Sequence, residues 1–202
     1  MVKMIAFINV AGCMDRIGTT TQAVQLTRFI KSMDYDVAYM EMNDKNYIKN
    51  TNNVYSDYEE KDTGIISVQG IDVIPRHKYI DIKKGGSNLD FLIIDHGCVN
   101  DKRFDRKEFL HGGIPILVGG IKANELGETE NALRDNEMQK AFFVFSFVEE
   151  GDNEELLLNM GRKKNETFFS PYFPDPFVQM DESKEDYFQQ VMSAVMLRVE
   201  RG

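Results

Sequence analysis

The chain has 202 residues and a formal net charge of −9, with 42% hydrophobic and 28% charged residues. This balance excludes a disordered or fibrous chain, and the length is sufficient for a sizeable core. The acidic charge argues against a nucleic-acid-binding protein, because phosphate contacts need clustered Lys and Arg. Two cysteines form no disulfide framework, and no run approaches the ~20 apolar residues of a membrane helix. We therefore expect a cytoplasmic protein without stable membrane insertion.

The N-terminal part predicts a strand, a turn and a helix. Residues 3–10 (KMIAFINV) form a short apolar run, and a glycine-containing turn follows at 11–18. Residues 19–33 then place apolar side chains at helical spacing, with polar ones between them. This order is the beginning of a βα unit.

A lipoprotein signal is the alternative for this region, since residues 10–13 (VAGC) resemble a lipobox. The apolar stretch before Cys13 is short for a signal peptide and is interrupted by Asn9. We favour the strand.

Strands and helices alternate along the rest of the chain. Residues 43–62 are polar and indicate a long surface connection with one helical turn, and Pro75 limits the strand before it to a short or edge strand. We expect one α/β domain over residues 1–202, with three αβα layers and a mostly parallel central sheet. Strands are predicted at 36–42, 71–74, 89–95, 114–118, 141–148 and 167–170, and helices at 122–138, 154–160 and 186–199.

The loop after the first strand is the main candidate site, because ligands of parallel sheets bind beyond the carboxyl ends of the strands. A loop that leads into a helix presents backbone N–H groups that suit a phosphate. Gly18 would allow close approach of the backbone, although a P-loop needs Lys where this chain has Thr19. The alternative is an ordinary turn in which Thr19 or Thr20 caps the helix. The candidate nucleotide-binding residues of the loop are Gly12, Cys13, Met14, Asp15, Arg16, Ile17, Gly18, Thr19, Thr20 and Thr21.

Two other strand ends carry polar residues that fit this chemistry. Asp95 ends an apolar strand and could hold a magnesium-bound water, with Thr20 as the second candidate metal ligand. Glu41 and Asn43 end the second strand, where a carboxylate could orient an attacking water, and they are the candidate catalytic residues. Each of these residues alone is what an ordinary polar strand end would show. The order of the loop and the two strand ends along the chain indicates a nucleotide site more specifically than any one of them does.

With these motifs, nearly the whole chain resembles the MinD/ParA-like P-loop ATPases of the SIMIBI class. That family has a strand, a K-G-G-x-G-K-T-T loop, a helix and a strand ending in D-x-D, which resemble residues 14–21 (MDRIGTTT) and 39–43 (YMEMN). Its strand ending in Asp resembles residues 91–97, and its proline-marked segment near the base resembles residues 170–176, with Pro171 and Pro174 as candidate contacts. The resemblance implies a P-loop NTPase-like fold, ATP or ADP with Mg²⁺, a homodimer and a protein partner in a larger assembly.

The chain departs from the family at the charged positions. Met14 and Thr19 stand where the family has lysines, and residues 145–147 (FSF) stand where a base-recognising Asn is usual. Since hydrolysis relies on positive charge at the phosphates, and Arg16 is the only nearby cation the sequence indicates, we expect weak or no hydrolysis. The missing lysine is similar to that of TadZ/CpaE-like proteins, which localise pilus and secretion machinery. Three hypotheses remain: a degenerate nucleotide switch, a nucleotide-free scaffold, and a slow ATPase that uses Arg16.

Two further clusters of reactive or charged residues could be functional, but each also has a purely structural explanation. Cys13, Cys98 and His96 could form a metal or redox site, but no second ligand pair accompanies them, so buried thiols are favoured. A basic cluster follows Asp95, and its interleaved acids favour a self-paired helix face. Its members are Lys102, Arg103, Arg106 and Lys107, with Asp101, Asp105 and Glu108 between them.

The last helix has one apolar side, and MinD-type proteins can end in a membrane-binding helix. Such helices carry Lys and Arg on the polar face. Here the helix is flanked by acids such as Asp181 and Glu185, so we expect it to pack on the sheet.

Overall fold

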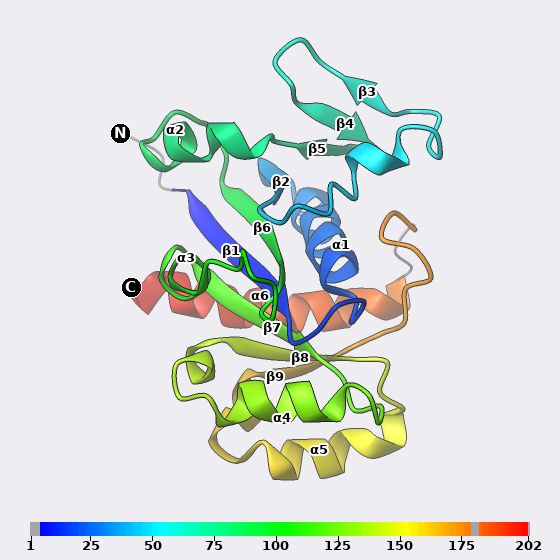
Figure 1. Cartoon of the computed structure of the whole chain (residues 1–202), viewed down its shortest axis with the longest axis vertical. Coiled ribbons are helices and arrows are strands. Elements are labelled where there is room, and N and C mark those ends of the chain that lie inside the picture. Colours follow the sequence, from blue (N-terminus) through cyan, green and yellow to red (C-terminus); the bar gives the residue numbers. More distant parts are fainter. Residues whose placement is uncertain (1–4, 179–181, 202) are drawn as a thin grey trace.

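The computed structural model describes residues 5–178 and 182–201, and in them nine strands join one sheet in the order β3-β4-β5-β2-β6-β1-β7-β8-β9 (Figure 1). Pairing is parallel from β5 through β9, whereas β3–β4 and β4–β5 are antiparallel. The mostly parallel sheet is thus confirmed. The strands are β1 (Ala6–Gly12), β2 (Val37–Glu41), β3 (Glu59–Glu60), β4 (Ile66–Val68), β5 (Ile71–Val73), β6 (Phe91–Cys98), β7 (Ile114–Gly119), β8 (Phe142–Ser146) and β9 (Thr167–Ser170).

Helices cover both faces of this sheet. On one face, α1 and α6 pack on Ile8 and Val10 of β1 through side chains such as Val24 and Phe188. On the other face, α2, α3 and α4 supply residues such as Phe109 to two further apolar clusters. The three-layer αβα fold class is therefore confirmed. The helices are α1 (Thr19–Ser32), α2 (Tyr79–Lys83), α3 (Arg106–His111), α4 (Leu126–Arg134), α5 (Asn153–Asn159) and α6 (Glu182–Arg201).

The strand β1 lies in the middle of the sheet, paired with β6 on one side and β7 on the other. Val10 is 1% exposed and Cys13 is fully buried. The interrupting residue Asn9 is also buried, and its side-chain amide donates to the carbonyls of Glu108 and Phe109 at 3.0 and 2.9 Å. Cleavage before Cys13 would remove this central strand, so the fold argues against the lipobox alternative.

The strand before Pro75, β5, is short, as expected, and the β3–β4 hairpin extends the sheet beyond it (Figure 1). Other sequence-based boundaries need correction. In the β3–β4 hairpin, β3 lies within residues 43–62, which were expected to be a surface connection, and β4 lies just after them, where no element was predicted. Strands of two and three residues are too short to show an alternating pattern of apolar and polar residues. The strand β6 continues past Asp95 to Cys98, with Gly97 at φ 75°. The helix expected at 122–138 is only α4, which is followed by a short 3-10 turn, Met138–Lys140.

The last helix packs on the sheet as expected, with Phe188, Val191 and Val195 almost fully buried. Within the described residues, no helix is both long and apolar enough to cross a membrane. The expected strand residues Lys3 and Met4 lie outside the described residues, as does Asp181.

Candidate nucleotide-binding site

The loop between β1 and α1 has a backbone conformation that requires glycine at particular positions. Arg16 and Gly18 both have positive φ, 61° and 95°. A Cβ on Gly12 would lie 2.3 Å from Thr19 Oγ1 and 2.6 Å from Ile17 Cγ2, so only glycine allows this close return of the loop. The loop is fixed to the sheet where the Cys13 N–H donates to Val118 O at 2.8 Å.

The N-terminus of α1 is not capped by a side chain. Gly18 is the N-cap residue and provides no side-chain hydrogen bond, so the interpretation of Thr19 or Thr20 as a simple cap is wrong. The first turn also contains no acidic residue. First-turn N–H groups without a capping side chain are free to meet an anion, and the helix dipole favours one there.

Thr20 instead donates its hydroxyl to Asp95 Oδ2, at 2.7 Å. Asp95 is fully buried and also accepts hydrogen bonds from the Tyr39 hydroxyl at 3.0 Å and the Gly97 N–H at 2.8 Å. Burial raises the pKa of Asp95, and these hydrogen bonds act in the opposite direction. Tyr39 lies within β2 among mostly apolar residues, and no sequence motif indicated that its hydroxyl would contact Asp95.

This donor set fits magnesium. An alcohol and a carboxylate are the hard oxygen ligands that Mg²⁺ takes, usually with several waters retained. Thr20 lines a cavity, whereas Asp95, which accepts a hydrogen bond from the Thr20 hydroxyl, is fully buried and is not among the residues that line it. Thr20 would therefore hold the ion directly, and Asp95 would hold it through water.

A cavity of about 400 Å³ lies over the loop and the start of α1, a volume in the range of small-molecule sites. Most of the predicted loop residues line it, as does Pro174. Gly12, Cys13, Ile17 and Pro171 do not; Cys13 and Ile17 are buried beneath the loop. The lining also includes Gly97, Phe147, Tyr172, Phe173 and Pro176, which belong to segments that the resemblance placed near the nucleotide. Lys45 and Tyr47 line it too, and the sequence did not indicate either of them.

Two aromatic rings stand at this cavity. Phe147 follows β8 and Tyr172 follows β9, and their ring centroids are 5.9 Å apart. Both rings are partly exposed, 37% and 63%. Lys122 Nζ lies 4.6 Å from the Phe147 centroid. The buried Ser146 hydroxyl, on the residue before Phe147, has no hydrogen-bond partner among the described residues. Partly exposed rings beside a loop of this shape suit a flat, partly polar group.

The candidate catalytic residues lie elsewhere. Glu41 and Asn43 line a second cavity of about 280 Å³ and not the first. Burial and the nearby Asp95 raise the pKa of Glu41 to about 7. Asn43 donates to Asp95 O at 3.1 Å and thus ties the end of β2 to β6. The structure does not bring either side chain to the cavity that Thr20 lines.

The cysteines and the neighbouring histidine are enclosed by the fold. Burial raises the pKa of Cys13 to about 12 and lowers that of His96 to about 4. The His96 ring packs 5.7 Å from the Phe109 ring, centroid to centroid. Such thiols are poor nucleophiles and metal ligands, which agrees with the structural interpretation. Within the described residues, no group of three or more His, Cys, Asp and Glu is arranged to hold a metal ion.

Among the described residues, the two arginines of the basic cluster after Asp95 form ion pairs with acids from outside the cluster. Arg103 pairs with Asp44, and Arg106 pairs with Asp135 at 2.6 Å and Glu137 at 2.8 Å. These partners come from other segments, so the cluster joins the segment after β6 to its neighbours.

Comparisons with known proteins agree with this fold. No family model and no curated protein matches the sequence. Among solved structures, MinD in the MinC:MinD cell division complex of Aquifex aeolicus matches at a TM-score of 0.67 and 10% identity, covering 95% of both chains. A plasmid partition protein of Borrelia burgdorferi B31 bound to AMPPNP matches at 0.63 and 15%, covering 97% of this chain and 99% of that one. A ParA family ATPase of Chlorobium tepidum matches at 0.55 and 14%, covering 96% and 93%. The fold is that of MinD and ParA.

Proposed function

We propose that this protein is a nucleotide-binding switch with the MinD/ParA fold, which binds ATP or ADP with Mg²⁺ and positions or regulates a larger assembly such as pilus or secretion machinery. The observation that carries the proposal is the uncapped start of α1 beside the Thr20–Asp95 hydrogen bond, under a cavity of about 400 Å³. It is supported by two relatives in fold: the Borrelia partition protein binds AMPPNP, and the Aquifex MinD binds MinC.

Each part of the cavity has a proposed role. The loop amides and the threonines at the start of α1 would hold the phosphates, and Thr20 with Asp95 would hold magnesium, which offsets phosphate charge when bound. Phe147, Tyr172 and Pro174 would contact the base. Recognition by ring faces gives little discrimination between bases, because every base has an apolar face.

Weak or no hydrolysis is part of the proposal. Met14 and Thr19 line the cavity at the positions where the resemblance implies lysines, so two charges that would stabilise a phosphoryl transition state are missing. Glu41 and Asn43 line the second cavity and not the one that Thr20 lines, so the proposal gives them no role in orienting water at the phosphate.

The switch would act through the segment after β6. Asn100 donates to Cys13 O at 3.3 Å and to Glu128 Oε2 at 2.8 Å, so this segment contacts both the phosphate loop and α4. Nucleotide that reorganises the loop would move Asn100 and change the surface offered to a protein partner or a second copy of the chain.

Titration calorimetry with ATP and ADP, with and without Mg²⁺, tests the proposal. We expect magnesium-dependent binding in the micromolar range, about −8 kcal/mol, and its loss in Thr20→Ala. Thr63→Ala, an exposed threonine outside the cavity, should bind like the wild type. Absence of binding up to millimolar nucleotide would instead support the scaffold hypothesis, and turnover above background would support the slow ATPase.

A further inference from the structure

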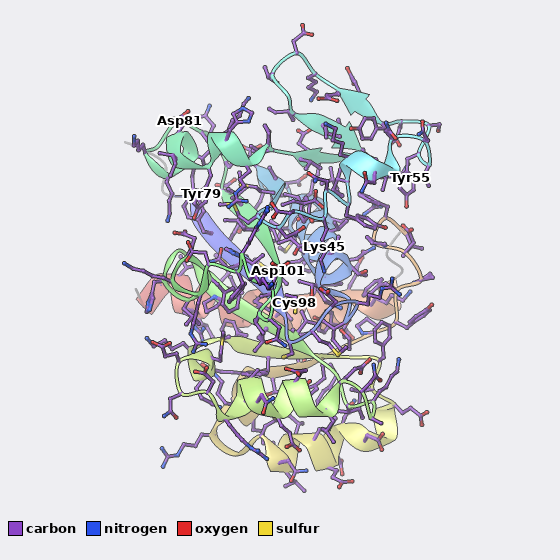
Figure 2. The ribbon with its side chains drawn as sticks, viewed as in Figure 1. Lys45, Tyr55, Tyr79, Asp81, Cys98 and Asp101 are labelled. Atoms are coloured by element: carbon purple, nitrogen blue, oxygen red, sulfur yellow. The ribbon has the colours of Figure 1, made fainter. Side chains whose placement is uncertain are left out.

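The cavity contains a cation that the sequence did not indicate. Among the described residues that line it, the positively charged ones are Arg16 and Lys45. The expectation that Arg16 is the only nearby cation is therefore wrong. Lys45 follows β2, far along the chain from the phosphate loop, and lies near the middle of the molecule beside α1 (Figure 2).

The backbone of Lys45 is fixed beside the phosphate loop. Its N–H donates to Asn43 Oδ1 at 3.0 Å, and the Asn43 amide donates to Asp95 O at 3.1 Å. Asn46 adopts φ 49°, which turns the chain directly after the lysine. These contacts tie the lysine backbone to the end of the strand that carries Asp95.

The Lys45 ammonium extends from this anchor to the Asp15 carboxylate in the phosphate loop. The two side chains are 45% and 63% exposed, so water screens the pair and separating it costs little. Without Lys45, the Asp15 carboxylate would repel a phosphate at the loop. With Lys45, the pair is neutral. The ammonium is held at the cavity, where a bound anion can replace Asp15 as its partner.

The contacts of Lys45 favour it over Arg16 as the phosphate-binding residue. Its N–H donates to Asn43 Oδ1 and its ammonium pairs with the Asp15 carboxylate, and the residue lines the same cavity as Thr20. Arg16 also lines the cavity and is exposed, but among the described residues no hydrogen bond or ion pair positions its side chain.

We propose that Lys45 is the phosphate-binding cation of this protein, which leaves Asp15 and pairs with the anion when a polyphosphate occupies the cavity. It would supply, from the loop after β2, charge that the loop itself lacks at Met14 and Thr19. This inference rests on the proposed function and assigns its phosphate contact.

Calorimetric titration with inorganic tripolyphosphate and with MgATP tests it, because tripolyphosphate isolates the phosphate contact from the base. Lys45→Met should raise both Kd values about tenfold or more, as loss of a hydrogen bond to a charged group does. Asp15→Asn should lower both Kd values several-fold, since it removes a competitor and a repelling charge. Lys45→Arg keeps the charge and should stay close to the wild type.

Lys49→Met is the matched control, since it removes the same charge from the same segment but lines only the second cavity. Thermal unfolding without ligand confirms that each variant folds. If Lys45→Met binds like the wild type, Lys45 is not the phosphate-binding cation, and the proposed function stands. If Lys45→Met and Asp15→Asn both weaken binding, the pair merely shapes the loop and the inference is overturned. If the wild type binds neither ligand, the inference and the proposed function fail together.

Discussion

At the scale of single residues, burial decides which ionisable groups have unusual pKa values. Asp95 is fully buried, with three hydrogen-bond donors on its carboxylate. Glu41 has fewer partners; its Oε1 accepts from the Ile48 N–H at 3.3 Å. Burial therefore raises its pKa to about 7, with the Asp95 charge acting in the same direction.

Glu41 should make stability depend on pH. Its folded pKa lies above the value near 4.5 of an unperturbed Glu, so the folded state keeps a proton that the unfolded chain releases. The free energy of unfolding should thus fall as pH rises from about 4.5 to 7. For the wild type relative to Glu41→Gln, we expect a fall of about 2–3 kcal/mol between pH 5 and pH 8.

Urea unfolding of both proteins at several pH values measures this difference. His96 acts with the opposite sign, because its lowered pKa removes stability as pH falls below about 6.5. It is present in both proteins and cancels in the difference. A difference that stays flat from pH 5 to pH 8 would mean that Glu41 is not desolvated in solution.

At the scale of elements, the junction of β1 and α1 depends on close approach. Gly12 ends β1 directly under Thr19, and a Cβ there would also lie 2.9 Å from the Met14 carbonyl oxygen. Side chains at this distance cannot relax without moving the loop backbone.

Gly12→Ala should therefore destabilise the protein by about 1–3 kcal/mol and weaken nucleotide binding, because the loop must shift. Gly127→Ala in α4 is the control: nothing lies within 4 Å of its Cβ position, and alanine should stabilise the helix by about 0.5–1 kcal/mol. The midpoints of urea unfolding of the two variants and the wild type measure these changes in stability. Equal stability of Gly12→Ala and the wild type would show that the loop has another conformation available.

At the scale of the whole molecule, burial is uneven. Every residue of β6 is buried, and β1 beside it is buried over its last five residues. In contrast, α5 has no buried residue and both residues of β3 are exposed. Figure 1 shows α5 and the β3–β4 hairpin at opposite ends of the molecule.

Hydrogen exchange should follow this pattern. Amides of β1 and β6 should exchange only through global unfolding, while those of α5 and the hairpin open locally and exchange at least about a hundredfold faster. Mass spectrometry of exchanged peptides measures both classes. If α5 is protected as strongly as β6, and the protection grows with protein concentration, a second copy of the chain covers α5.

The sequence by itself determined the local units and their class. Apolar runs and helical spacing predicted β2, α1, β7 and β9 to within one residue at each end. They could do so because burial in a sheet, or on one face of a helix, requires apolar residues at regular positions along the chain. The alternation of these units predicted the mostly parallel sheet, and the carboxyl-end rule predicted the loop over which the cavity lies.

Only the tertiary structure decided which distant side chains complete the site. The sheet order places β2 and β6 side by side, which brings Tyr39 to Asp95 and Lys45 to Asp15. It also turns Glu41 towards a second cavity. No periodicity encodes such contacts, because they depend on how strands separated by long connections cross and pair. Each helix or strand is therefore encoded by neighbouring residues in the sequence. Which charged side chains meet at the candidate site depends on how the whole sheet is assembled.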